Sequence, residues 1–417
     1  MNILYLSLDN GIPVLGAKGA SVHVRSFVTA LAALGHTVVL ACSRLGEGDA
    51  PPPARLLMLA PEIPPAAPAR EWYALGRGGE PPDEPLLRRE LARLAHDRML
   101  PRRLLAALGL IRFRPDLIYE RQALFYCAGA ALTAGLGIPR VLEVNAPLVE
   151  EQARFRGLRL EPAARAREAD SYRGAEAIVA VSAAVAAHVR SVLGDSAPVH
   201  VVPNGVDLAR YDASADGAGI RARLGLGAAP VIGFVGSFKP WHGAPFLFEV
   251  FRRLAQSRPE LRLIAVGEGP ELQEMRARVA EYGLADRVAL PGRVAHSEIP
   301  AWLAAMDITV APYLPQPDFY FSPLKIVESL AAGRPVVAPR LGQIAELVEH
   351  RRTGLLYTAG EPVSCTAALR TLLDAPARRR AMGEAARQRV AGFGWEDVAR
   401  RALALVQPEP ALARRFA

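Results

Sequence analysis

The chain has 417 residues, which is too long for one ordinary hydrophobic core and predicts two domains. Hydrophobic residues make up 51% of it and charged residues 22%, a composition that excludes general disorder. The formal net charge is +8, but only three of the 50 basic residues are lysines, and this excess of arginine indicates a coding bias. The positive charge therefore argues only weakly for an acidic partner such as a membrane surface.

The N-terminus begins directly with a strand-like apolar run and lacks the basic region and cleavage site of a signal peptide. No segment approaches the ~18 uninterrupted apolar residues of a membrane-spanning helix. Cys42, Cys127 and Cys365 lie far apart without metal-binding spacing, and we interpret them as buried apolar residues. We therefore expect a cytoplasmic protein with no nucleic-acid partner, while peripheral contact with the inner face of a membrane stays open.

The first elements predict a strand, a glycine-rich loop, a helix and a second strand over residues 3–43. Val24, Phe27, Val28 and Leu31 follow the spacing of a helix packed on a sheet, and Gly35 is a natural end for that helix. This order is typical of a βαβ unit.

Residues 47–103 interrupt the pattern with Pro-rich stretches, one short strand at 55–60 and helical segments after residue 84. We interpret them as an insertion in the first domain that exposes Trp72 and Tyr73. Further strands of the first domain are expected at 116–120, 139–144, 175–182 and 199–205.

A second series of strands alternates with helices after a junction near residues 203–217. Its strands are expected at 230–237, 261–269, 287–293, 308–313, 334–340 and 354–357. The fold class is therefore α/β, with an N-terminal domain at 1–203 and a C-terminal domain at 204–390, each built on a parallel sheet. Residues 391–417 are expected to form a helix that packs back across the domains.

The most informative segment is FYFSPLKIVESLAAGRPVVA, residues 319–338. Ser322 is a good N-cap and Pro323 suits the first helical position, which places Lys325 in the first turn. A cation there opposes the helix dipole unless an anion binds at the same end. The segment therefore predicts a phosphate site, with Glu328 either binding the hydroxyls of a ribose or simply paired with Lys325.

The scarcity of lysine makes Lys18, Lys239 and Lys325 informative. A lysine that survives such a bias marks a position that needs a compact ammonium, unless it survives by chance. Lys18 lies in the first glycine loop, Lys239 in the loop after VGS, and Lys325 on the phosphate helix. We expect these three loops to converge near a diphosphate.

The ordered motifs VVPNGVD, VGSFKPWHG, VGEGPEL, LPGRVAHSEIPAWLAAMDITVAPY and SPLKIVESLAAGRPVVA resemble the C-terminal half of family 4 glycosyltransferases. The opening GAKGASVHVRSFVTALAALGHTV resembles their N-terminal glycine loop and helix, so the likeness covers most of the chain except the insertion. It implies the GT-B fold, in which two Rossmann-like domains face each other across a cleft. It also implies sugar transfer from a nucleotide diphosphate donor with retention of anomeric configuration and without metal.

The resemblance further implies a donor site in which the SPLK segment grips the diphosphate, Glu328 binds the ribose, and Arg293 and Val294 lie beside the base. The donor is expected to be a UDP- or GDP-sugar, with no cofactor and no metal. Lys239 and Lys325 are catalytic candidates because they would neutralise the leaving group. The expected donor-binding set is Gly19, Ser237, Lys239, His242, Gly267, Glu268, Gly269, Arg293, Val294, Tyr320, Ser322, Pro323, Leu324, Lys325 and Glu328.

The chain departs from the family pattern at three places. Tyr320 stands eight positions before Glu328, where the family has a second glutamate, which leaves the donor sugar open. His242 replaces the basic residue usually found before a glycine, with Lys239 nearby as a substitute. Asn145 stands where many members have a histidine facing the acceptor, and it is a third catalytic candidate.

Lys18, His23 and Glu143 are candidates for the acceptor side, although His23 also fits a core or surface histidine and Glu143 a capping residue. The leading hypothesis is transfer to a glycan or lipid-linked glycan acceptor in polysaccharide biosynthesis. A sugar-nucleotide epimerase of the same architecture and a non-catalytic nucleotide-sugar-binding partner subunit remain alternatives. A nicotinamide oxidoreductase is disfavoured, because neither GAKGAS nor GEGPEL matches G-x-G-x-x-G.

Overall fold

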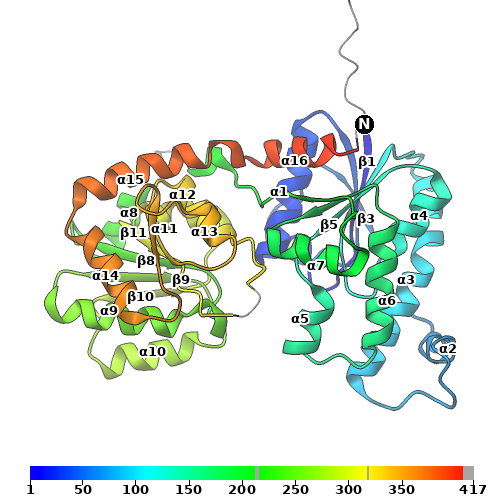
Figure 1. Ribbon diagram of the computed structural model, residues 1–417, viewed down its shortest axis with the longest axis horizontal. Coiled ribbons are helices and arrows are strands. Elements are labelled where there is room, and N and C mark those ends of the chain that lie inside the picture. The colour runs from blue at the N-terminus through cyan, green and yellow to red at the C-terminus, as the bar shows by residue number, and fades with distance from the viewer. Residues whose placement is uncertain (212–215, 317–318, 407–417) are drawn as a thin grey trace, which may run out of the picture. The chain divides into compact units, whose positions relative to one another are not determined.

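The computed structural model describes residues 1–211, 216–316 and 319–406. These residues form two compact units, one made of Met1–Pro203 together with the chain from Trp395 onward, and one made of Asn204–Gly394. Figure 1 shows each unit as a central sheet with helices on both of its faces.

The first unit is built on a seven-stranded sheet, as far as its described residues go, with the strand order β3-β2-β1-β4-β5-β6-β7. Every neighbouring pair in this sheet is parallel. The strands are β1 (Asn2–Ser7), β2 (Thr37–Cys42), β3 (Arg55–Met58), β4 (Leu117–Arg121), β5 (Arg140–Val144), β6 (Ala177–Ala180) and β7 (Val199–Val201). Its helices are α1 (Gly19–Ala33), α2 (Ala67–Ala74), α3 (Pro85–Leu110), α4 (Ala128–Leu136), α5 (Leu148–Phe155), α6 (Glu161–Arg173), α7 (Ala183–Leu193) and α16 (Trp395–Ala404).

The second unit contains a six-stranded parallel sheet among its described residues, in the order β10-β9-β8-β11-β12-β13. The strands are β8 (Val231–Val235), β9 (Arg262–Val266), β10 (Val288–Gly292), β11 (Ile308–Val310), β12 (Val336–Pro339) and β13 (Gly354–Tyr357). The α-helices are α8 (Gly217–Arg223), α9 (Ala244–Ser257), α10 (Leu272–Glu281), α11 (Ile299–Ala304), α12 (Leu324–Ala331), α13 (Ile344–Leu347), α14 (Pro362–Leu373) and α15 (Pro376–Arg389). Short 3₁₀ turns lie at η1 (Leu208–Tyr211), η2 (Pro240–His242), η3 (His296–Glu298) and η4 (Ala391–Phe393).

The continuous apolar runs of the central strands explain why both sheets are covered on both faces. In β1, Ile3, Leu4, Tyr5 and Leu6 are each 0% exposed, although successive side chains point to opposite faces. Such strands are typical of parallel sheets buried between helices. The structure confirms the predicted α/β class with two parallel sheets.

The segment interpreted as an insertion at 47–103 is more closely integrated than expected. Its strand β3 pairs with β2 at the edge of the sheet, and its last helical part continues past residue 103 as α3. Leu100, Leu104 and Leu108 of α3 pack in the core cluster that holds Leu4 and Leu6 of β1. The many prolines in this segment argued against a core helix, so the apolar stripe of α3 was not predicted. Of the two aromatic residues expected to be exposed there, Tyr73 is 57% exposed.

Two further local expectations differ from the structure. Trp72 is partly buried, because its ring packs on the cluster around Leu87 and Leu91 and its Nε1 donates to the Gly78 carbonyl. Cys127 is half-buried in a polar contact with Asp97. Cys42 and Cys365 are buried, as expected.

The last described helix, α16, belongs to the first unit and packs on α1. The ring of its first residue, Trp395, meets the edge of His23 at 4.8 Å between ring centroids. The remainder of the segment at 407–417 lies outside the described residues.

Candidate functional site

Two glycine loops at the carboxyl ends of β8 and β9 lie against each other through their backbones. The Gly236 N–H donates to the Val266 carbonyl at 3.0 Å, and the Phe238 N–H donates to the Glu268 carbonyl at 2.8 Å. Gly267 has φ +136°, and a Cβ there would collide with the Gly236 carbonyl oxygen. Ligands of open α/β sheets bind at this edge, outside the carboxyl ends of the strands.

Lys325, in the first turn of α12, extends under these loops. Its Nζ lies 4.7 Å from the ring centroid of Phe234 and 4.8 Å from that of Tyr313. A Cβ on Gly236 would come within 2.5 Å of the same Nζ. Although the residue as a whole is half-buried, the Nζ itself is buried and has no hydrogen-bond partner among the described residues. Burial lowers the pKa of Lys325 to about 7, partly opposed by the charge of Glu328.

Ser322 does not cap the phosphate helix as the sequence predicted. The helix α12 begins at Leu324, and its N-cap is Pro323, without a side-chain cap hydrogen bond. The Ser322 Oγ instead accepts the Asn204 N–H at 3.3 Å, and its carbonyl accepts the Asn204 Nδ2 at 3.0 Å. Lys325 is therefore the second helical residue rather than the third. The Ile326 N–H donates to the Pro323 carbonyl at 3.0 Å, which leaves the N–H groups of Leu324 and Lys325, as far as the described chain goes, for another partner.

Glu328 is held by a histidine and not by Lys325. Its Oε1 lies 2.9 Å from Nε2 of His296, and Nδ1 of His296 lies 3.1 Å from Nη1 of Arg210. Because a guanidinium only donates, Nδ1 must accept and Nε2 must carry the proton that His296 donates to Glu328. This chain of contacts fixes the orientation of the carboxylate that the sequence assigned to a ribose.

His242 is neutral in this environment. Its Nδ1 lies 2.7 Å from the Ser237 carbonyl oxygen, so this nitrogen carries the hydrogen, and it lies 2.9 Å from the Ser237 Oγ. Burial, together with the charges of Lys325 and Lys239, lowers the pKa of His242 to about 2. Any positive charge from this loop therefore comes from Lys239, whose half-buried side chain places Nζ 4.9 Å from the Trp241 ring centroid.

The remaining donor-side candidates lie around the same loops. Arg293 Nη1 is 3.3 Å from the Glu268 Oε1 in an exposed ion pair, and Val294 packs on the core of the second unit. Gly269 has φ +153° and approaches the backbone of Phe238. Tyr320 is 7% exposed and its ring is tilted on Phe321 at 4.4 Å, so it packs within its loop.

The acceptor-side candidates of the first unit form a buried polar cluster around Glu143 on β5. Its two carboxylate oxygens contact His23 Nε2 at 2.9 Å, Tyr119 Oη at 2.9 Å, Arg121 Nη1 at 2.8 Å and Asn145 Nδ2 at 2.6 Å. Burial raises the pKa of Glu143, but His23 and Arg121 outweigh it and lower that pKa to about 2. The cluster joins α1, β4 and β5 and orients the loop that begins at Asn145.

Lys18 and Gly19 lie apart from this cluster at the start of α1. Lys18 is the N-cap of α1 but makes no side-chain cap hydrogen bond. Its exposed side chain donates from Nζ to the Gly11 carbonyl at 3.0 Å, which ties the glycine loop back on itself. Gly19 is exposed at the first position of the helix.

Sequence reasoning did not find the partners that position these groups. His296 lies three residues after Arg293, in a segment for which the sequence predicted only contact with the base. Tyr119 and Arg121 alternate with Glu120 along β4, and this alternation puts them on one face of the sheet, where Glu143 of the adjacent strand lies. This alternation in the sequence could have indicated that Tyr119 and Arg121 share a face. Their contact with Glu143 also depends on the pairing of β4 with β5, two strands that are distant in sequence.

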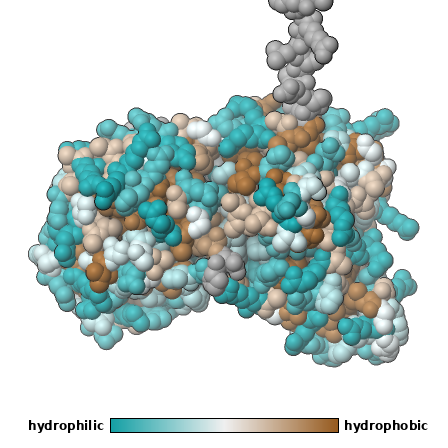
Figure 2. All heavy atoms as spheres, in the orientation of Figure 1, coloured by the Kyte–Doolittle hydropathy of each residue, from teal (hydrophilic) through white to brown (hydrophobic). Residues whose placement is uncertain are grey.

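In the described part of the chain, no helix combines the length and apolar character needed to cross a membrane. Figure 2 shows hydrophilic residues over much of the drawn face, with apolar patches interspersed among them.

Two family models match separate parts of the chain. The one described as "Glycosyltransferase Family 4" matches residues 17–210, and the one described as "Glycosyl transferases group 1" matches residues 229–375. These ranges hold the polar cluster around Glu143 and the glycine loops with Lys325, respectively.

Curated relatives and solved structures agree with these matches. The chain is 31% identical to a D-inositol 3-phosphate glycosyltransferase of Pseudarthrobacter chlorophenolicus over 69% of this chain and 69% of the relative. It is 26% identical to a glycogen synthase of Mycobacterium tuberculosis over 96% of this chain and 92% of the relative. A crystal structure of the Anabaena protein HepE in complex with UDP-glucose superposes with a TM-score of 0.70, covering 97% of this chain and 98% of that one at 21% identity, a likeness that concerns the fold.

Proposed function

Because the chain belongs to glycosyltransferase family 4, we propose that it moves a sugar from a UDP- or GDP-sugar to a glycan or lipid-linked glycan acceptor, with retention of anomeric configuration. The family membership makes it a glycosyltransferase that uses a nucleotide-sugar donor, in a GT-B fold. The relatives named above are a transferase and a synthase, and nothing in these comparisons supports the epimerase alternative.

The observation that carries the donor assignment is the buried Nζ of Lys325 at the start of α12, which has no hydrogen-bond partner among the described residues. A buried ammonium without a partner is costly, and an anion that accepts its hydrogen bonds removes that cost. The N–H groups of Leu324 and Lys325 at the helix start offer further donors, and the close-packed glycine loops leave room for phosphate groups. We therefore place the nucleotide diphosphate in the second unit.

In the proposed mechanism the protein stabilises the departing diphosphate with its own cations. Lys325 and Lys239 supply positive charge, while His242, held neutral, positions the Ser237 loop. Glu328, oriented by His296, binds the ribose hydroxyls, and Arg293 with Val294 lies beside the base. Stabilising a leaving group in this way requires no metal ion.

The first unit takes the acceptor in this proposal, with Asn145 and Lys18 as the contact candidates and Glu143 and His23 holding Asn145 in place. A lipid-linked acceptor would bring the chain to a membrane surface. Leu105 and Leu110 of α3 are 43% and 86% exposed, and Arg102 and Arg112 of the same stretch are also exposed. Exposed leucines among arginines match an anionic lipid surface.

Release of nucleoside diphosphate from a panel of nucleotide sugars tests the function directly. We expect one UDP- or GDP-sugar to be consumed only when a glycan or lipid-linked acceptor is present, and without added Mg²⁺ or Mn²⁺. Release without any acceptor would instead indicate an epimerase or hydrolase. A rate that disappears in the chelator and returns with Mg²⁺ or Mn²⁺ would contradict metal-independent transfer.

The affinity for a nucleoside diphosphate should fall as the pH rises from about 7.5 to 9. The pKa of Lys325 is about 7 in the free protein, and a bound diphosphate favours its charged form, so binding takes up a proton in this range. The sign follows because affinity is greatest where Lys325 is already protonated and decreases by up to about tenfold per pH unit above its pKa. Calorimetry in two buffers of different ionisation enthalpy measures the proton uptake. Affinity and proton uptake that do not depend on pH would argue against contact with Lys325.

A further inference from the structure

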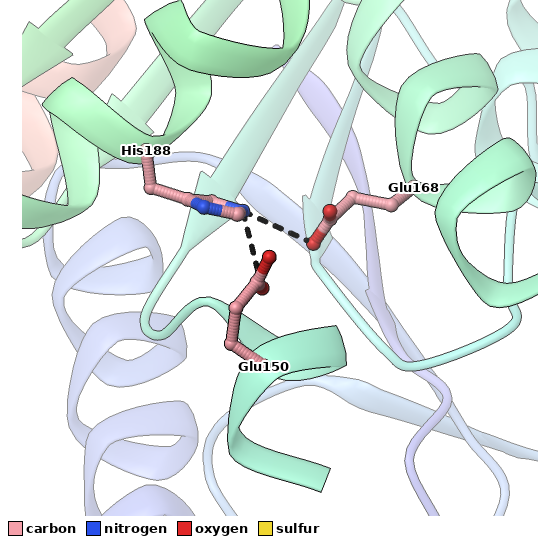
Figure 3. A group of neighbouring side chains, drawn as sticks. All are labelled: Glu150, Glu168 and His188. Carbon is pink, nitrogen blue, oxygen red and sulfur yellow. Dashed lines mark ion pairs between the residues drawn. The ribbon is translucent and has the colours of Figure 1, made fainter. Parts of the chain in front are cut away.

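A histidine and two glutamates of the first unit converge outside the groups assigned to donor and acceptor. Figure 3 shows Glu150, Glu168 and His188 pointing toward one another from three helices, which are α5, α6 and α7. Each offers one ligand atom, and these atoms all lie within 4.8 Å of one another. The proposed transfer mechanism uses none of the three side chains.

The distances in this group fit ion pairs and come close to those of a shared metal ion. Nε2 of His188 lies 3.4 Å from Oε1 of Glu168 and 3.8 Å from Oε2 of Glu150. Metal–nitrogen and metal–oxygen bonds of about 2.0–2.2 Å place neighbouring ligand atoms of a zinc tetrahedron about 3.4 Å apart. Both the His188 Nε2 and the Glu150 Oε2 are buried atoms without a hydrogen-bond partner in the described residues.

The surroundings of the group orient its carboxylates. Tyr172 Oη donates to the Glu168 Oε1 at 3.1 Å, and Gln122 Nε2 lies 3.3 Å from the same oxygen. Arg165 Nη1 donates to the Glu150 Oε1 at 2.9 Å, which leaves Oε2 facing His188. Hydrogen bonds of this kind hold the ligating carboxylates of metal sites in place. Together the two carboxylates and Arg165 carry one net negative charge.

We propose that Glu150, Glu168 and His188 bind a zinc ion that ties α5, α6 and α7 together. One imidazole nitrogen and two carboxylate oxygens are ligands that zinc accepts, and water completes a tetrahedral site with three protein ligands. The Glu150 side chain, which is 42% exposed on its short helix, would have to move toward His188 for all three atoms to bind one ion. Such an ion would cross-link the three helices and would have no part in the departure of the diphosphate.

The zinc site also bears on the acceptor loop. The helix α5 starts at Leu148, directly after the loop that begins at Asn145. A bond from Glu150 to two neighbouring helices would fix the end of this loop, as Glu143 fixes its beginning. The ion would therefore order the acceptor side of the first unit.

Metal binding to the full chain tests the proposal without using activity. After removal of metal with a chelator and exchange into chelator-free buffer, titration with Zn²⁺ should show one site per chain and raise the melting temperature, and Co²⁺ should give the visible absorption of a tetrahedral site. Glu150→Gln and His188→Ala should each lower the affinity at least tenfold, since losing one ligand of three leaves an incomplete site.

His200→Ala is the matched control, because His200 is an exposed histidine of the same unit. This variant should bind Zn²⁺ like the unaltered chain. Glu150→Gln changes a partly exposed side chain and keeps its shape, so it tests the site even when His188→Ala does not fold. Absence of stoichiometric Zn²⁺ binding, or equal binding by Glu150→Gln, would overturn the proposal and show that a protonated His188 pairs with the two glutamates.

Discussion

The Lys325→Met variant should transfer sugar about 10²–10³-fold more slowly at saturating donor, a loss of about 2.7–4 kcal/mol in transition-state stabilisation. Methionine has a similar length but no charge, so the pocket between Phe234 and Tyr313 stays filled. The free protein should remain folded, because burial already disfavours the ammonium and lowers its pKa to about 7. Measurement of kcat together with the melting temperature separates the two effects.

Arginine at the same position provides a second variant. A guanidinium keeps the charge but is too large for the space under Gly236, so Lys325→Arg should also impair turnover. Arg352→Ala, which removes a charge from a side chain that is 68% exposed in the same unit, is the control and should leave the rate unchanged. If both Lys325 variants transfer sugar at a rate close to that of the unaltered chain, the position does not need an ammonium group and its lysine survives by chance.

The Glu143→Gln variant should lose about 3–5 kcal/mol of stability, because it leaves the buried Arg121 without its charged partner. Its amide nitrogen also replaces one acceptor oxygen with a donor, opposite either His23 and Tyr119 or Arg121 and Asn145. The unfolding midpoint in denaturant measures the loss. Glu161→Gln, an exposed change in the same unit, should have an effect within about 0.5 kcal/mol.

The same carboxylate predicts acid sensitivity of the first unit. The folded pKa of Glu143 is about 2 and its ordinary value is 4.5, so its contribution is present above about pH 5 and is lost as the pH falls toward 2. The contribution amounts to about 3 kcal/mol, since one pKa unit corresponds to about 1.36 kcal/mol. Glu143→Gln should remove this part of the pH dependence. An unaltered acid-unfolding curve in the variant would contradict the assigned pKa.

The architecture was predictable because its signals are local. Apolar runs such as ILYLSL alternate with helical stripes such as that of Val24, Phe27 and Val28, and this alternation is enough to predict two parallel sheets. The helix α3 was harder, because Pro101 lies inside it and the apolar Leu100, Leu104 and Leu108 face a sheet that comes from distant segments. Its role as a core helix depends on that packing rather than on its own composition.

For the candidate site, the sequence allowed a prediction only of which loops lie together. Motif order placed Lys325, Glu328 and the glycine loops in the second unit, and the structure brings Gly236, Gly267 and Lys325 together. The helix boundary and the partner of Glu328 could not be predicted, since Asn204 draws Ser322 away from the cap and His296 arrives from η3. Such contacts depend on side chains that are far apart in sequence.

The glycine contacts of the donor loops have a consequence for protein engineering. Because Gly236, Gly267 and Gly269 touch backbone or Lys325 where a Cβ would sit, a mutant library that varies them yields mainly damaged proteins. Useful diversity for changing the accepted sugar nucleotide lies instead at positions whose side chains border the proposed site without sealing it, such as Arg293 and Val294. A directed-evolution campaign should therefore keep the three glycines constant and randomise their neighbours.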